Sequence, residues 1–354
     1  MAFADRSQDT GPSAMEEFFF DLRGYTVLQA LSATELNQIN GWIDSRRETI
    51  KQIMQSDRVD YMPREPSQSL GGMQIQSYHN GEQNAHIGHA DDGINLQFPY
   101  EAGPPFEALI DHPSFIGRVQ HYLGQSQPYL HELFINLRGS GGYIGCHGGG
   151  PQFISDGTQL RSPWGAAAFR TDDTSHDPHT GTHRGHHVTW NVPYLSIIIA
   201  LSDIGHGDGA TVCIPSSHKS MVGHPIQQQM VTEGSAVEGG TEMLLKAGEA
   251  LIFQDSLIHG ATARKNPDGW RRTLCFRYLP QEAALDRFGY TPSAECMARL
   301  SPRRRELLTQ RADVNDPWGQ AHLKLVSAAE GKALPYLPNG RRPQPAAGHS
   351  YSKL

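Results

Sequence analysis

The sequence predicts a mainly β protein, a jelly roll or similar two-sheet barrel with helices around it. The first observation is a block of short segments between residues 131 and 280. These segments are rich in β-branched, aromatic and leucine residues, and turn residues separate them. The second observation is that helix-forming segments precede this block and follow it.

The first expected helix covers residues 32–53. Ser32 and Glu35 form a capping-box pattern at its start, and apolar residues then recur at helical spacing as far as Ile50. This segment is therefore expected to form one N-terminal helix.

Two further segments are expected to be helical, and one long segment is expected to be irregular. Residues 112–124 form a helical pattern that Gly124 ends, and residues 291–312 form another. The run Arg303–Arg305 is interpreted as the solvated start of a helix. Residues 55–104 are expected to be irregular because Gly, Pro, Asn and Asp interrupt them.

The strand block contains the expected barrel. Its strands have apolar or β-branched interiors and are bounded by glycine, proline or polar turns. In chain order they are 131–139, two strands within 187–204, then 209–215, 242–254 and 271–280.

Charge and composition limit the kinds of partner. The chain has 354 residues, a formal net charge of −7 and a pI near 6.2. A small-molecule partner is expected, with no nucleic acid and no membrane, because no basic surface is indicated. The sequence has no long apolar span, no recognisable signal peptide and no C-x-x-C pair among its four cysteines, so a soluble chain with free thiols is expected.

A single elaborated domain is expected over residues 18–320, with its β core at about 131–280. A flexible N-terminus (1–17) and a flexible tail (335–354) would flank it. The tail finishes in Ser352–Leu354, the S-K-L tripeptide that the peroxisomal import receptor recognises. Peroxisomal localisation is therefore expected in a eukaryote, and a cytoplasmic one otherwise.

His259 and Arg271 give the first chemical signal. His259 follows one expected strand, and Arg271 opens the next, with Arg272 beside it. Such a histidine can bind a metal while the guanidinium binds a dicarboxylate in fork geometry. His147, in "YIGCHGGGPQ", is expected to meet His259 on facing strands.

Four blocks carry a resemblance to a known family: "GYTVL" near the N-terminus, the His147 segment, "ALSDIGHGDGATVCIPSSHKS" and "AGEALIFQDSLIHGATA…WRRTLCFRYLP". Together they resemble the phytanoyl-CoA dioxygenase family of iron(II)- and 2-oxoglutarate-dependent oxygenases. The resemblance implies a double-stranded β-helix with an H-x-D…H iron site. It also implies a 2-oxoglutarate-binding arginine after the distal histidine. His147 and His259 match the histidines, and Arg271 matches the arginine, with Arg272 as its near rival.

The motif departs from the family at Gly149, where the aspartate is expected. The usual non-haem iron site has two histidines and one carboxylate. Two other H-x-D patterns occur. One runs from His206 to Asp208 in a turn, and the other begins at His89, before the first barrel strand. Both are interpreted as turn or loop residues. The histidine-rich cluster 171–187 is interpreted as a polar loop over the site. An aspartate of residues 171–177, or Asp208, stays open as a source of the missing carboxylate.

Three hypotheses follow for the function. His147-Gly148-Gly149 is similar to the H-x-G motif of iron/2-oxoglutarate halogenases. The first hypothesis, which the sequence favours over the second, is therefore halogenation of an aliphatic C–H bond with Fe(II), 2-oxoglutarate, O2 and chloride, with the halide at the position of Gly149. The second is a hydroxylase with a displaced or absent carboxylate ligand, since glycine also suits a turn of positive φ. The third is an iron-free, non-enzymatic homologue, against which His259 and Arg271 argue.

Overall fold

The computed structural model describes residues 11–55, 69–77, 93–124, 127–148, 152–153, 159–160, 170–171, 188–190, 192, 194–220, 224, 237–281 and 290–309. Several sequence predictions lie outside the described residues and stay predictions. They concern Gly149, His89, Asp91, residues 172–187 and the tail that ends in Ser352–Leu354.

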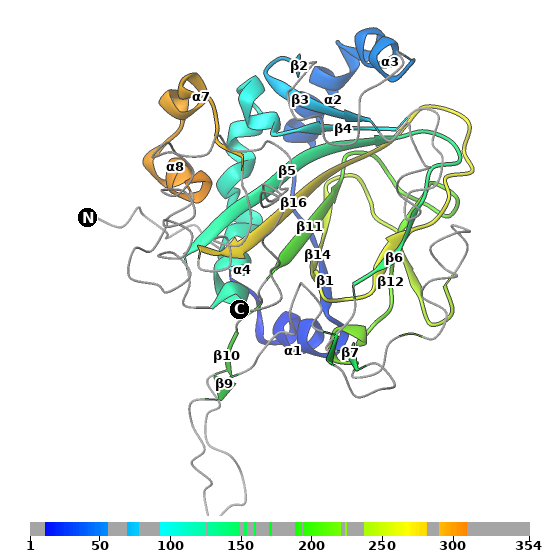
Figure 1. The fold of residues 1–354 in the computed structure, drawn as a ribbon, viewed down its shortest axis with the longest axis vertical. Coiled ribbons are helices and arrows are strands. Elements are labelled where there is room, and N and C mark those ends of the chain that lie inside the picture. The colour runs from blue at the N-terminus through cyan, green and yellow to red at the C-terminus, as the bar shows by residue number, and fades with distance from the viewer. Residues whose placement is uncertain are drawn as a thin grey trace, which may run out of the picture.

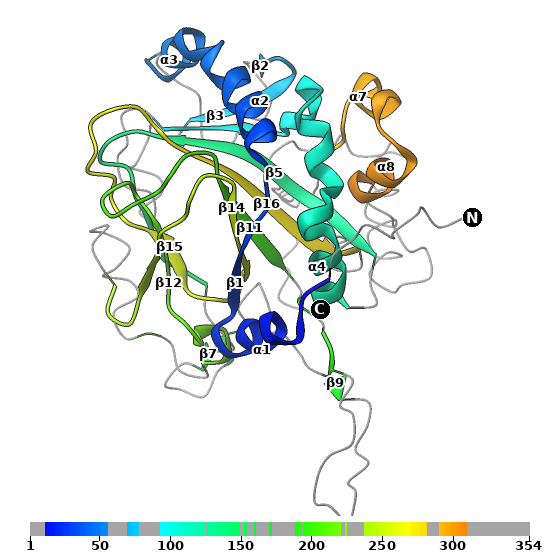
Figure 2. The same ribbon diagram turned by 180° about the vertical axis from the view of Figure 1, so that it is seen from behind.

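Two antiparallel sheets form the frame of the described part of the chain (Figures 1 and 2). The major sheet has the strand order β1-β14-β11-β16-β5-β4-β3-β2, and the minor sheet has the order β13-β12-β15-β6. The predicted jelly roll, a double-stranded β-helix, is therefore confirmed. The major-sheet strands are β1 (Tyr25–Gln29), β2 (Ser69–Leu70), β3 (Met73–Ser77), β4 (Ile94–Gln97), β5 (Pro128–Arg138), β11 (Leu195–Ala200), β14 (Glu249–Gln254) and β16 (Arg271–Pro280). The minor-sheet strands are β6 (Ile144–His147), β12 (Thr211–Cys213), β13 (Thr241–Met243) and β15 (His259–Ala261).

Two short hairpins accompany the sheets. They pair β7 (Gln152–Phe153) with β8 (Gln159–Leu160), and β9 (Arg170–Thr171) with β10 (Val188–Thr189). The second hairpin brackets the histidine-rich cluster predicted as a loop.

Helices cover the outer face of the major sheet, opposite the minor sheet (Figure 2). Most of the large apolar side chains are buried between these helices and the major sheet. The helices are α1 (Ala14–Arg23), α2 (Ala33–Asp44), α3 (Arg47–Gln55), α4 (Pro113–Leu123), α7 (Ala294–Arg299) and α8 (Pro302–Leu308), with 3-10 turns η1 (Pro99–Ala102), η2 (Phe106–Asp111) and η3 (Ser217–Lys219). Helix α1 begins before the expected start of the domain at residue 18. No helix in the described ranges has both the length and the apolar character that a membrane span needs.

The capping box at Ser32 is confirmed, but the single helix expected over 32–53 is wrong. Both reciprocal bonds between Ser32 and Glu35 are present. The helix stops at Asp44 and α3 starts afterwards, because the Ser45 hydroxyl donates to the Trp42 carbonyl and offers the backbone an alternative to helix.

The helix expected over 291–312 is likewise divided. Helix α7 ends at Arg299, and Ser301 then caps α8 by accepting a bond from the Arg304 amide. The predicted helix start at Arg303–Arg305 is confirmed, although Arg304 also binds Asp111 at 2.7 Å.

The expectation that residues 55–104 are irregular is wrong for the described part of that segment. Strands β2, β3 and β4 lie there and extend the major sheet beyond β5. These strands are short, and turn residues separate them, so the sequence lacked a long period-2 pattern. Strand β4 pairs with β5, β3 pairs with β4 and β2 pairs with β3, so this pairing stabilises them as strands.

Strand β16 separates the two candidate arginines. Successive side chains on a strand point to opposite faces. Arg271 therefore points between the sheets, and Arg272 points outward to Asn40 and Asp44 of α2, at 3.0 and 2.6 Å. The inward face of β16 also carries Cys275.

Candidate metal and co-substrate site

His147 and His259 meet on paired strands of the minor sheet. They end β6 and begin β15, and they are register partners in that pair. Their ring centroids lie 4.2 Å apart. The sequence prediction that these two imidazoles come together is thus met by the geometry.

Both rings are oriented by the backbone in the same way. Nδ1 of His147 lies 2.9 Å from the Gly145 carbonyl, and Nδ1 of His259 lies 2.8 Å from the Leu257 carbonyl. Because a carbonyl only accepts, each Nδ1 carries the proton and donates it. Each Nε2 is then the basic nitrogen, the arrangement found in metal-binding histidines.

His259 also has the protonation state that metal binding needs. Burial, with His147 nearby, lowers the pKa of His259 to about 3. The His259 imidazole is therefore neutral at pH 7 and able to offer its Nε2 lone pair. The residues present fit a divalent metal in this respect.

A third ligand is not in place among the described residues. No group of three or more histidine, cysteine or acidic side chains there has the geometry to hold a metal ion. The carboxylate next to the pair is Asp255, whose Oδ1 lies 4.0 Å from Nε2 of His259. Sequence reasoning did not single out Asp255.

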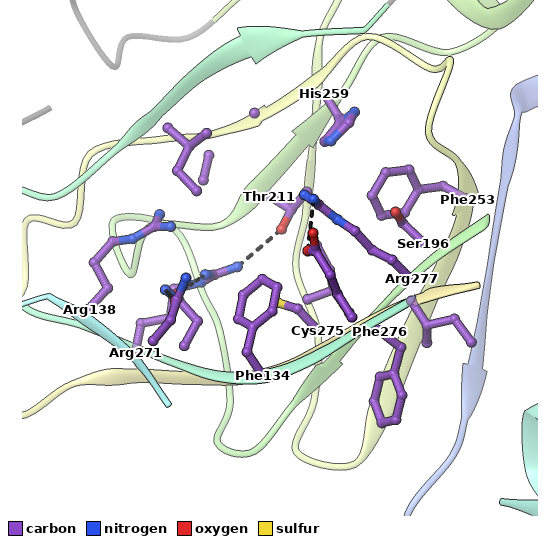
Figure 3. Close-up of a pocket in the computed structure, with 18 of the residues that line it drawn as sticks. Phe134, Arg138, Ser196, Thr211, Phe253, His259, Arg271, Cys275, Phe276 and Arg277 are labelled. Carbon is purple, nitrogen blue, oxygen red and sulfur yellow. Dashed lines mark hydrogen bonds and ion pairs between the residues drawn. The ribbon is translucent and has the colours of Figure 1, made fainter. Parts of the chain in front are cut away.

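The paired histidines face a cavity of about 370 Å³ between the two sheets (Figure 3). One end of this cavity holds Arg271, which donates to Oγ1 of Thr211 at 3.1 Å and to Oδ1 of Asn136 at 3.3 Å. Arg138 lies opposite Arg271 across β5 and β16, and both side chains are buried.

Two guanidinium groups at one end of a buried cavity fit a dianion. A buried carboxylate needs a fixed opposite charge, and a guanidinium supplies two parallel charge-assisted bonds. The Thr211 hydroxyl beside Arg271 can bond the same carboxylate. Arg271 therefore suits 2-oxoglutarate, whereas the outward-pointing Arg272 does not.

Strand β16 supplies a second ion pair to the cavity. Arg277 donates to Glu132 of β5 at 3.1 Å, and both side chains line the cavity (Figure 3). Ser196 and Phe253 stand nearby on the same wall. A substrate in this space would contact both charged and apolar groups.

The alternative H-x-D pattern at His206 lies away from this cavity. The His206 side chain is 76% exposed and contacts Glu242. Asp208 accepts a bond from the Gly205 amide at 3.0 Å, as a turn residue does. Neither residue lines the cavity, so the structure does not bring Asp208 to the histidines.

Sequence reasoning missed several residues of the cavity wall. Asn136 and Arg138 are polar residues at alternate positions near the end of β5, among apolar neighbours, and that pattern could have marked them. Asn95 lies in the segment expected to be irregular, and it bonds Asn136 at 2.8 Å. Thr211 gave no signal, because threonine is ordinary in a strand.

The fold and the site together define a class: a double-stranded β-helix with paired histidines and a buried arginine. The family model for phytanoyl-CoA dioxygenase (PhyH) matches residues 20–273. The chain belongs to this family of iron(II)- and 2-oxoglutarate-dependent oxygenases. A comparison with curated proteins found no match.

The chain is similar to several solved structures. HygX from Streptomyces hygroscopicus, with nickel and 2-oxoglutarate bound, is 17% identical with a TM-score of 0.50, covering 77% of this chain and 88% of its own. The epimerase SnoN from nogalamycin biosynthesis is 14% identical, with a TM-score of 0.46 and coverage of 75% and 80%. EctD from S. alaskensis with bound Fe is 16% identical, with a TM-score of 0.42 and coverage of 79% and 80%. At these identities the likeness to HygX supports the fold alone.

Proposed function

We propose that this chain uses iron(II), 2-oxoglutarate and dioxygen to oxidise an aliphatic C–H bond of a small molecule in the cavity. The pairing of His147 with His259, each with its Nδ1 on a backbone carbonyl, carries this proposal. When bound, iron(II) with 2-oxoglutarate supplies dioxygen activation and hydrogen abstraction, and 2-oxoglutarate leaves as succinate and carbon dioxide.

Residues at the two ends of the cavity would bind different groups. His147 and His259 would hold the metal, and Arg271 with Thr211 would bind the distal carboxylate of 2-oxoglutarate. The Arg277 side of the cavity would face the substrate.

Hydroxylation is the outcome that we favour. A hydroxylase of this kind needs one protein carboxylate at the metal. Asp255 is a buried carboxylate close to His259. Its presence supports the displaced-carboxylate hypothesis over the halogenase hypothesis.

Halogenation is the second candidate, and it rests on Gly149 in the sequence. A halide can supply both the ligand and the negative charge that this glycine lacks. Chloride is a co-substrate in this candidate alone.

Two measurements test the function. Protein loaded anaerobically with iron(II) should consume 2-oxoglutarate and form succinate in air, and His147→Ala should retain no iron. Wild-type iron content in that variant would refute His147 as a metal ligand, whereas a wild type that binds no iron would refute the enzyme assignment and favour the non-enzymatic homologue.

Product mass separates hydroxylation from halogenation. A mixture of small metabolites is incubated with the loaded protein under 18O2, with and without chloride. Hydroxylation predicts a product carrying one oxygen-18 at a rate independent of chloride. A product that forms only with halide and shows its isotope pattern would establish halogenation.

A further inference from the structure

A buried carboxylate lies directly beside the histidine pair. Asp255 follows the end of β14, in the loop that leads to His259. It is 2% exposed, and its Oδ1 accepts a bond from the Ser196 hydroxyl at 2.7 Å. The same oxygen is 4.0 Å from Nε2 of His259.

The loop that carries Asp255 packs against the incomplete H-x-G motif. Gly148 has a φ of +89°, and a Cβ there would stand 2.5 Å from the Leu257 carbonyl and 3.0 Å from the Asp255 carbonyl. Only glycine fits such a close approach. The loop backbone therefore touches the residue that joins His147 to Gly149.

We infer that Asp255 supplies the carboxylate ligand that Gly149 cannot. The metal would then have two imidazoles and one carboxylate from the protein, with three positions left for co-substrate and oxygen. No position is left for a halide. This inference rests on the proposed use of iron(II).

The movement required is small. Two adjacent ligands of a six-coordinate metal, each at about 2.1 Å, lie about 3.0 Å apart. The present separation of 4.0 Å between Asp255 and His259 therefore has to shrink by roughly 1 Å. Ser196 can keep its bond to the carboxylate and orient it.

Metal titration of Asp255→Asn tests the inference without any turnover. Asparagine keeps the volume and can still accept the Ser196 bond, but it has no charge. The dissociation constant for Co(II), measured anaerobically by calorimetry, should rise more than about tenfold. The matched control is Asp111→Asn, another mostly buried carboxylate, which binds Arg304 away from the cavity and should leave metal binding unchanged.

A double-mutant cycle distinguishes a ligand from a merely supporting carboxylate. If Asp255 is the ligand, Gly149→Asp should tighten Co(II) binding strongly in the Asp255→Asn protein and hardly at all in the wild type. An equal gain in both backgrounds would show that the position was vacant and overturn the inference.

Chloride binding provides a second readout, should Gly149→Asp fail to bind metal at all. Chloride should shift the charge-transfer band of the iron(II)·2-oxoglutarate complex in Asp255→Asn and leave the wild-type band in place. An equal shift in both proteins overturns the inference. Unchanged metal affinity in Asp255→Asn refutes this role alone, whereas a wild type without metal affinity refutes the proposed function itself.

Discussion

Replacing Arg271 by alanine should weaken 2-oxoglutarate binding by at least a hundredfold. Arg271 is 5% exposed and its guanidinium already bonds Thr211 and Asn136, so it is held in place before the dianion arrives. Removing one partner of a buried charge pair costs about 3–5 kcal/mol. At about 1.4 kcal/mol per factor of ten, this corresponds to roughly 150- to 4,000-fold. Arg138 keeps part of the attraction from the opposite strand, so the lower end of that range is expected.

The matched control is Arg272→Ala, which removes the same side chain one position along β16. Arg272 binds Asp44 on the outer face, and its partner is half exposed. The variant should keep its 2-oxoglutarate affinity and lose at most about 1 kcal/mol of stability. Calorimetric titration of the metal-loaded, anaerobic proteins with 2-oxoglutarate measures both variants. Weaker binding in Arg272→Ala with unchanged binding in Arg271→Ala would refute the assignment of β16 faces.

Two further predictions concern stability. Gly148→Ala should lower the free energy of unfolding by about 2 kcal/mol or more, because the left-handed backbone and a 2.5 Å approach to the Leu257 carbonyl both oppose a Cβ. Urea unfolding measures this change, and an unchanged unfolding midpoint would contradict the close packing at Gly148. Burial lowers the pKa of His218 from 6.5 to about 4, so the unfolded chain binds the extra proton. The stability due to neutral His218 is present above pH 6.5 and is lost as the pH falls toward 4, by about 2 kcal/mol between pH 7 and 5. His218→Asn should flatten the pH dependence, and an equal slope in both proteins would contradict this.

Local sequence signals predicted the elements whose stabilising bonds are local. The capping box of Ser32 and Glu35 involves residues three positions apart, and Gly124 ends α4 by its own positive φ. The break after Asp44 was not predictable from periodicity, because the apolar spacing continues to Ile50. The bond from the Ser45 hydroxyl to the Trp42 carbonyl ended the helix at this point.

Strands in the segment 55–104 were missed for the opposite reason. Strand β4 consists of Ile94–Gln97, which is too short to show an alternation. Its hydrogen bonds go to β5, so its conformation depends on a distant partner. Asn95, which contributes to the cavity wall, was missed with it.

The sequence by itself predicted the fold class. It also singled out two histidines and two neighbouring arginines as candidate site residues, because strand patterns and motif spacing are local properties. It left Arg271 and Arg272 as rivals, and the register of β16 against β5 decided between them by pointing one inward. Asp255 carries no motif in the sequence. Asp255 lies only four residues before His259, but the tertiary structure alone brings its loop against Gly148, because the close packing of a glycine against a carbonyl depends on two segments far apart in the chain.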